Sequence, residues 1–134
     1  MMSCQNFSDL FLKIYNRYHF KECKIFPSET EDGRSWCSLE YKIIIIEKSQ
    51  WACGDARSVF SLLHEIGHVM TNTLDMPRCD QEYLATKWAI DKMIKYGFDI
   101  EQDLKDSYQH YIFTYYINKE SIYKDPYYYE LKWN

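Results

Sequence analysis

The sequence has no apolar run long enough to cross a bilayer. Its longest wholly apolar run is Ile43-Ile44-Ile45-Ile46, whereas a membrane-spanning helix needs about 20 such residues. The first residues, Met1 to Asn6, also lack the basic start and the long apolar stretch of a signal peptide. We therefore expect a cytoplasmic protein that does not insert into a membrane.

A basic excess is missing as well. Sixteen lysines and arginines stand against 20 aspartates and glutamates, so the net charge is −4 and the isoelectric point is about 5.5. A protein that neutralises several phosphates needs a basic patch or stripe, and the charges along each predicted helix are mixed. Direct binding to nucleic acid, including a role as a small transcription regulator, is therefore not expected.

The spacing of the cysteines and the small numbers of glycines and prolines exclude further classes of protein. The five cysteines are widely spread and form no C-x-x-C pair, which argues against a disulfide framework and against a thiolate zinc cluster. We expect them to be reduced thiols. Only four glycines and three prolines are present, and no repeat or linker interrupts the chain. A chain of 134 residues suits a single core, so residues 1–134 are predicted to form one domain.

The hydrophobic pattern predicts an α+β fold, with helices packed on a small β-sheet. A β-branched run over residues 41–47 follows residues 34–39 and suggests a hairpin, with its Ile43 to Ile46 segment covered on both faces. An alternation after Pro126 predicts a short terminal strand over residues 127–133. Apolar residues recur at helical spacing in four other stretches: residues 6–18, with Ser3 as an alternative start, 55–72, 80–96 and 100–118.

The predicted helix over residues 55–72 carries an H-E-x-x-H motif, His64-Glu65-Ile66-Gly67-His68. Histidines are costly to bury on a helix that is apolar around nearly its whole circumference. Side chains at i and i+4 project from one face, so both imidazoles can reach a single Zn²⁺. Glu65 then lies beside the metal, where it can take a proton from an activated water. The motif predicts a zinc site with ligands His64 and His68 and general base Glu65.

A catalytic zinc needs a third protein ligand and an open fourth position. Glu82 is our candidate, because Ala85 and Ala89 follow it at i+3 and i+7 and let its helix approach the helix of the two histidines. Gly67 supports the same close approach. Glycine inside a helix costs about 1 kcal/mol relative to alanine, and room for a second helix backbone to come close would offset that cost. Three residues of the connecting segment remain rival ligands: Asp75, Cys79 and Asp80.

Two blocks of this chain match the motifs of a known family. The stretch from Arg57 to His68 has the pattern R-x-x-F-S-x-x-H-E-x-G-H, and Glu82 to Ala89 has the pattern E-x-x-A-x-x-W-A. Both resemble the motifs of ImmA/IrrE-like zinc metallopeptidases, and the resemblance covers roughly residues 41–90. It implies a minimal zincin-like domain, with zinc ligands His64, His68 and Glu82 and catalytic base Glu65.

The resemblance also implies a function and shows one departure. That family usually has an acidic residue two positions after its glutamate ligand and Asn or Asp four positions after it, where this chain has Leu84 and Thr86. Thr86 can orient a ligand only through its single hydroxyl. The implied activity is limited cleavage of a regulatory protein, such as a helix-turn-helix repressor, in a phage or mobile element.

Two questions remain open at this level. A donor that stabilises the oxyanion is expected, and it could be His110, a tyrosine between Tyr108 and Tyr116, or a tyrosine of the terminal strand. The alternative to an enzyme is a catalytically silent zincin-like module that binds a partner protein through its tyrosine-rich C-terminal region. The intact Glu65 favours the enzyme, because a purely structural zinc site has no need of it.

Overall fold

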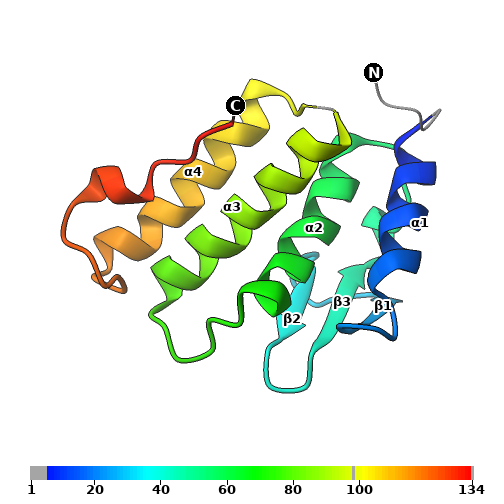
Figure 1. Ribbon diagram of the computed structural model, residues 1–134, viewed down its shortest axis with the longest axis horizontal. Coiled ribbons are helices and arrows are strands. Elements are labelled where there is room, and N and C mark those ends of the chain that lie inside the picture. Colours follow the sequence, from blue (N-terminus) through cyan, green and yellow to red (C-terminus); the bar gives the residue numbers. More distant parts are fainter. Residues whose placement is uncertain (1–5, 98, 134) are drawn as a thin grey trace.

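The computed structural model describes residues 6–97 and 99–133, and within them four α-helices accompany one small β-sheet. The helices lie side by side, and the sheet lies below α1 and α2 (Figure 1). In chain order the elements are α1 (Phe7–Tyr18), β1 (Lys24–Ser28), β2 (Trp36–Ser38), β3 (Ile43–Glu47), the 3-10 helix η1 (Lys48–Gln50), α2 (Ala56–Thr71), α3 (Arg78–Tyr96), α4 (Gln102–Ile117) and the 3-10 helix η2 (Pro126–Tyr129). The predicted α+β class, with helices packed on a small sheet, is confirmed.

The four predicted helices are all present, with ends within two residues of the expected positions. The side chains of Asn6 and Asp55 each accept a hydrogen bond from a backbone N–H in the first turn of α1 and α2, as N-caps do. Residues in the left-handed conformation end α2 and α3, namely Asn72 with φ 49° and Gly97 with φ 80°. The alternative start at Ser3 lies outside the described residues. No helix in the described part is long and apolar enough to cross a membrane.

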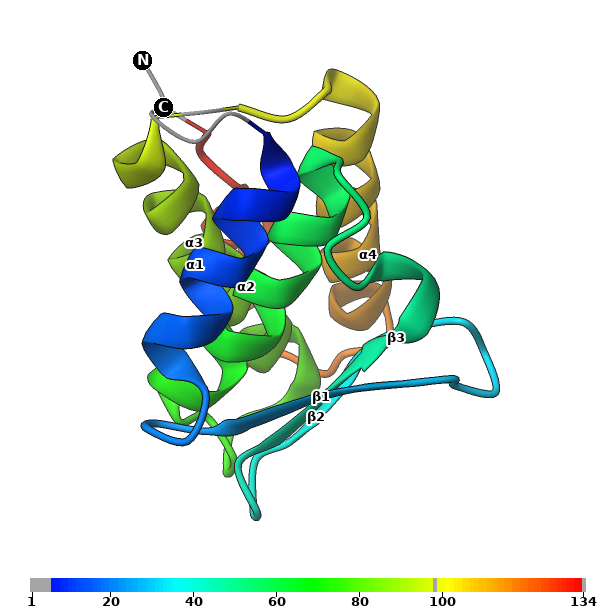
Figure 2. The same cartoon turned by 90° about the vertical axis from the view of Figure 1, so that its right-hand side faces the viewer.

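The sheet has the strand order β1-β3-β2, with β1 parallel and β2 antiparallel to β3. The β2–β3 pair is the predicted hairpin. Strand β1 was not predicted, because Pro27 and the polar residues after it suggest a turn; proline is tolerated there because β1 is an edge strand. The helices cover one face of the sheet (Figure 2). The expected cover on both faces is therefore incomplete: Ile44 and Ile46 are fully buried, whereas Ile43 and Ile45 are half-buried.

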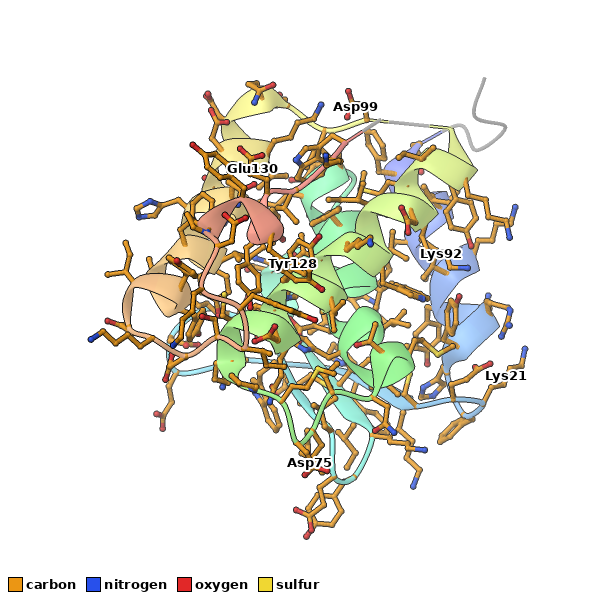
Figure 3. All side chains as sticks on the ribbon, turned by 60° about the vertical axis from the view of Figure 1, so that its left-hand side comes forward. Lys21, Asp75, Lys92, Asp99, Tyr128 and Glu130 are labelled. Atoms are coloured by element: carbon orange, nitrogen blue, oxygen red, sulfur yellow. The ribbon has the colours of Figure 1, made fainter. Side chains whose placement is uncertain are left out.

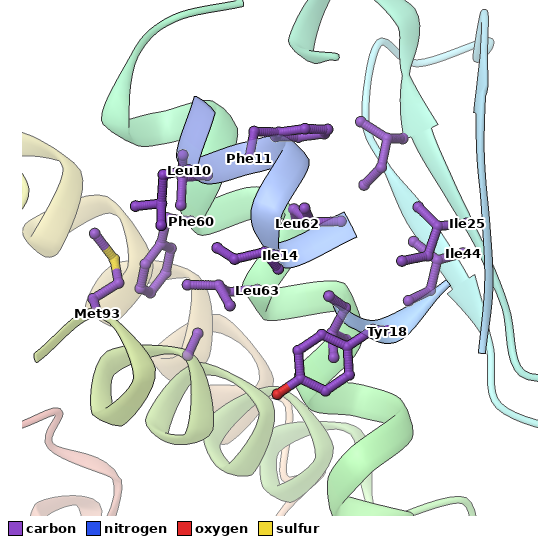
Figure 4. Packing of buried hydrophobic residues seen from close by; sticks show 14 of the residues in the cluster. Leu10, Phe11, Ile14, Tyr18, Ile25, Ile44, Phe60, Leu62, Leu63 and Met93 are labelled. Atoms are coloured by element: carbon purple, nitrogen blue, oxygen red, sulfur yellow. The ribbon is translucent and has the colours of Figure 1, made fainter. Parts of the chain in front are cut away.

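Helix α2 runs through the main core, between α1, α3 and the sheet. Figure 4 shows Leu62 and Leu63 of this helix among apolar side chains of its neighbours, which include Leu10, Phe11, Ile14, Tyr18, Ile25, Ile44 and Met93. Nearly the whole length of α2 is buried, as its apolar circumference predicts. Such dense packing holds the polar residues of α2 in fixed positions.

The predicted terminal strand over residues 127–133 is wrong. Residues up to Tyr129 form η2, and the described residues after it join no strand. The side chain of Gln109 on α4 takes the place of a strand partner: its Nε2 donates to the Tyr129 carbonyl at 2.9 Å, and its Oε1 accepts from the Leu131 N–H at 2.7 Å. Of the alternating residues, Tyr127 is exposed, Tyr129 is buried, and Leu131 and Trp133 are half-buried. This partial burial comes from packing against helices and not from membership of a sheet.

Candidate metal centre

Helices α2 and α3 approach each other closely at Gly67. A Cβ added to Gly67 would lie 2.6 Å from the carbonyl oxygen of Ala85, closer than real Cβ atoms come to other atoms. Ala85 and Ala89 are fully buried in α3. The close approach predicted from these small residues is confirmed, and it brings side chains of the two helices within reach of one another.

Three buried side chains from α2 and α3 converge beside this contact. The Nε2 atom of His64 lies 3.1 Å from Oε1 of Glu82, and Nε2 of His68 lies 3.2 Å from Oε2 of the same carboxylate. One ligand atom from each of the three residues lies within 4.8 Å of the others. Two donors bonded to one tetrahedral zinc at ~2.0–2.1 Å lie about 3.3 Å apart. The donor types and their spacing therefore suit a metal ion, and this group could hold one.

Burial and mutual charge set the pKa values in this group. Burial disfavours the charged form of His64, but the hydrogen bond and negative charge of Glu82 outweigh it and raise the pKa of His64. Burial also disfavours the carboxylate of Glu82, but hydrogen bonds from His64 and His68 hold the pKa of Glu82 well below its usual range. The negative charge of Glu82 thus stabilises a positive charge on His64, and a metal cation bound by these residues would supply that positive charge in place of a proton.

Thr86, one turn after Glu82, orients His64. Its Oγ1 lies 2.7 Å from the carbonyl oxygen of Glu82 and 3.1 Å from Nδ1 of His64. A carbonyl oxygen can only accept, so the hydroxyl donates its one proton there and its oxygen accepts from Nδ1–H of His64. A proton on Nδ1 leaves Nε2 as the atom that can face a metal. The threonine thus provides an orienting contact where the ImmA/IrrE-like pattern has Asn or Asp.

The rival ligands point elsewhere. Asp75 lies on the exposed loop between α2 and α3 (Figure 3). The thiol of Cys79 donates to a backbone carbonyl of α4 at 3.6 Å. The carboxylate of Asp80 accepts from the Tyr129 hydroxyl at 2.8 Å and so holds the C-terminal segment. Among the described residues, Glu82 is the one that joins the two histidines.

The group lies in a cleft of about 720 Å³. Its walls come from α2, from β2 and the loop before it, from the start of α3, and from α4. Glu65 lines the same cleft next to His64 and is 9% exposed. Burial raises the pKa of Glu65, although the positive charges of His64 and His68 oppose this. A carboxylate with a raised pKa is a stronger base, which suits proton transfer near neutral pH.

Three of the tyrosines considered as oxyanion donors line this cleft: Tyr108, Tyr111 and Tyr115 of α4. The ring of Tyr108 lies 5.7 Å from that of His64, centroid to centroid, and burial raises the pKa of Tyr108 to about 12. The hydroxyls of Tyr111 and Tyr115 are 3.0 Å apart. His110 and the tyrosines of the C-terminal segment do not line the cleft in the described part of the chain. Among the candidates for stabilising the oxyanion, these three tyrosines of α4 are the ones that line the cleft.

Arg78 was missed from the sequence. Its Nη2 lies 3.4 Å from Oε2 of Glu82 and 3.3 Å from the Tyr115 hydroxyl oxygen, and its guanidinium lies over the Tyr115 ring at 5.3 Å. The signal was present, because Arg78 and Glu82 are at i and i+4 on one helix. The positive charge of Arg78 stabilises the negative charge of Glu82, and the contact restrains the Oε2 atom of Glu82.

Comparison with known proteins finds no relative. No protein-family model matches the chain. No curated protein and no solved structure matches it significantly either. The resemblance to ImmA/IrrE-like metallopeptidases therefore depends on the two sequence blocks alone.

Proposed function

We propose that the protein is a zinc-dependent metallopeptidase, with zinc held by His64, His68 and Glu82. The observation that carries this proposal is the convergence of these buried side chains, with Glu65 beside them, in one cleft. Structural zinc sites are closed by four protein ligands, whereas catalytic sites keep one position open. The described residues bring three ligands together at a site that opens to a cleft, which favours the catalytic kind.

The proposed reaction is hydrolysis of a peptide bond. Zinc bound at this site supplies a positive charge that polarises the carbonyl and activates water. Glu65 accepts the proton of the attacking water on a carboxylate oxygen and then donates it to the nitrogen of the leaving amine. Hydroxyls of α4, from Tyr108, Tyr111 or Tyr115, donate to the carbonyl oxygen as negative charge develops there.

The proposed substrate is a regulatory protein, such as a helix-turn-helix repressor, that is cut at few positions. The support is the family resemblance together with the size of the domain, since 134 residues leave little surface for a long series of subsites. The described cysteines, Cys23, Cys37, Cys53 and Cys79, are free thiols, which supports a cytoplasmic setting, and a phage or mobile element is the proposed source.

Replacing the base tests the enzyme directly. The Glu65→Gln variant keeps the ligand set, so it should bind one zinc per chain by elemental analysis and cleave no peptide bond. Glu101→Gln is the matched control, because Glu101 is exposed on the N-terminal side of α4. The His68→Ala variant should lose zinc. Cleavage by metal-loaded, contaminant-free Glu65→Gln protein would show that Glu65 is not the base.

A second proposal, a silent module that binds a protein partner, is supported by the exposed tyrosines of the C-terminal segment. Tyr127 is 75% exposed and Tyr128 is 43% exposed, and Figure 3 places Tyr128 on the outer side of the helices. Exposed aromatic residues are enriched at interfaces. This function predicts that the Glu65→Gln variant keeps full biological activity, which separates it from the peptidase.

A further inference from the structure

Arg57 extends the cleft face of α2 beyond the metal group. Arg57, Ser61, His64 and His68 stand at i, i+4, i+7 and i+11 of one helix, and all four line the cleft. Residues at this spacing share one face. Arg57 is therefore an exposed residue on the side of α2 that forms a wall of the cleft.

A hydrogen-bonded bridge brings a second arginine, Arg34, to the same end of the cleft. The hydroxyl of Ser58, next to Arg57, donates to the backbone carbonyl of Gln50. The hydroxyl of Ser35, next to Arg34, donates to the side-chain Oε1 of Gln50 at 3.4 Å. Gln50 thus ties the loop before β2 to the first turn of α2, and Arg34 also lines the cleft.

The charges of these two arginines are not balanced by ion pairs. Within residues 6–97 and 99–133, the ion pairs of the protein involve neither Arg34 nor Arg57. Apart from Glu65 and Glu82, the acidic residue that lines the cleft is Asp32, whose Oδ1 accepts from the backbone N–H of Arg34 at 3.1 Å. Two arginines thus stand against one aspartate at this end of the cleft, so the end keeps an excess of positive charge, although the whole protein carries a net charge of −4.

The helix geometry sets the distance from this basic end to the metal group. Arg57 precedes His64 by seven residues, which is about 10 Å along an α-helix. An extended peptide advances about 3.3 Å per residue. We infer that Arg34 and Arg57 select an acidic substrate, by binding an Asp or Glu side chain about three residues from the bond that is cut. This inference rests on the proposed peptidase function and specifies its substrate class.

Selection from a peptide library tests it without requiring cleavage. Zinc-loaded Glu65→Gln protein is immobilised and incubated with a random library of synthetic peptides about 12 residues long, and retained peptides are identified by mass spectrometry. Exposed ion pairs are individually weak, so two of them should enrich Asp and Glu about threefold or more over the input. An acidic protein retains basic peptides non-specifically, so acid enrichment marks a specific site.

Matched variants assign the enrichment to the two arginines. The double substitution Arg34→Gln and Arg57→Gln should return acidic residues to the input frequency, whereas Arg57→Lys should keep most of the enrichment because it keeps the charge. The control is Arg17→Gln, an arginine of α1 that pairs with Glu22 at 3.1 Å and does not line the cleft. Circular dichroism and urea unfolding show that each variant is folded.

Two results would overturn the inference: no acid enrichment by the Glu65→Gln protein, or undiminished enrichment by the folded double variant. Failure of the peptidase itself is recognised separately. Wild-type protein that is loaded with zinc and cuts neither the library nor a candidate repressor speaks against the enzyme. The same protein can still select acidic peptides, so the two outcomes are distinguishable.

Discussion

Replacing Gly67 with alanine adds one methyl group at the contact between α2 and α3. Its carbon would lie 2.6 Å from the carbonyl oxygen of Ala85 and 3.2 Å from that residue's C and Cα atoms. Ordinary contact begins at 3.4 Å, so the nearest atom is about 0.8 Å too close. All three contacting atoms belong to the backbone, and no rotamer change can relieve them. The two helices must therefore move apart.

The separation should weaken metal binding more than it weakens folding. Overpacking of this kind costs about 1–3 kcal/mol, and the higher helix propensity of alanine offsets about 1 kcal/mol, so the free energy of unfolding should fall by about 0–2 kcal/mol. Metal–ligand distances tolerate only about ±0.2 Å. A displacement several times larger moves Glu82 away from His64 and His68, and we expect zinc affinity to fall about 10- to 100-fold, as when groups that support a metal ligand are lost.

Competition with a chromophoric chelator measures the zinc affinity, and urea unfolding of the metal-free protein measures the stability. Gly97→Ala is the matched control. It adds the same methyl group at the end of α3, with no atom within 4 Å but with a φ of 80°. It should lose about 1–2 kcal/mol through backbone strain and keep its zinc affinity. A Gly67→Ala variant that gains about 1 kcal/mol of stability and binds zinc normally would refute the close approach.

Two further substitutions test individual hydrogen bonds, and one reagent tests the burial of the cysteines. Thr86→Val removes the acceptor for Nδ1–H of His64 and should lower zinc affinity about 10- to 100-fold in the same competition assay. Tyr129→Phe leaves Asp80 without one of its donors, so it should lower the free energy of urea unfolding by about 1–3 kcal/mol. Iodoacetamide at pH 8 should alkylate the exposed Cys53 in the folded protein, as peptide mapping by mass spectrometry will show, well before the buried thiols.

Each of these predictions has a control. Thr114→Val should leave zinc affinity unchanged, because that hydroxyl donates to a carbonyl within α4. Tyr127→Phe, at a 75% exposed ring, should change stability by less than about 0.5 kcal/mol. Burial raises the pKa of Cys23 to about 11 and that of Cys79 to about 12. At pH 8 both therefore stay almost entirely in the unreactive thiol form. Equally fast alkylation of either would contradict this burial.

The parts of this protein that the sequence alone predicts are local. The spacing of His64 and His68 places both imidazoles on one helix face, because the pitch of an α-helix is the same in every fold. The caps of α2, and Gly97 at the end of α3, act within a few residues of themselves, so they mark helix ends without knowledge of the tertiary structure.

The tertiary structure decided which groups far apart in the chain contact one another. Asp80 and Glu82 are both carboxylates near the start of α3. The first is taken by the Tyr129 hydroxyl and the second meets the two histidines. Strand β1 forms because it hydrogen-bonds to the edge of β3. The C-terminal segment forms no strand, because the Tyr129 carbonyl and the Leu131 N–H bond to the side chain of Gln109 instead. Contacts between residues far apart in the chain depend on how the helices pack, and hydrophobic periodicity carries no information about that.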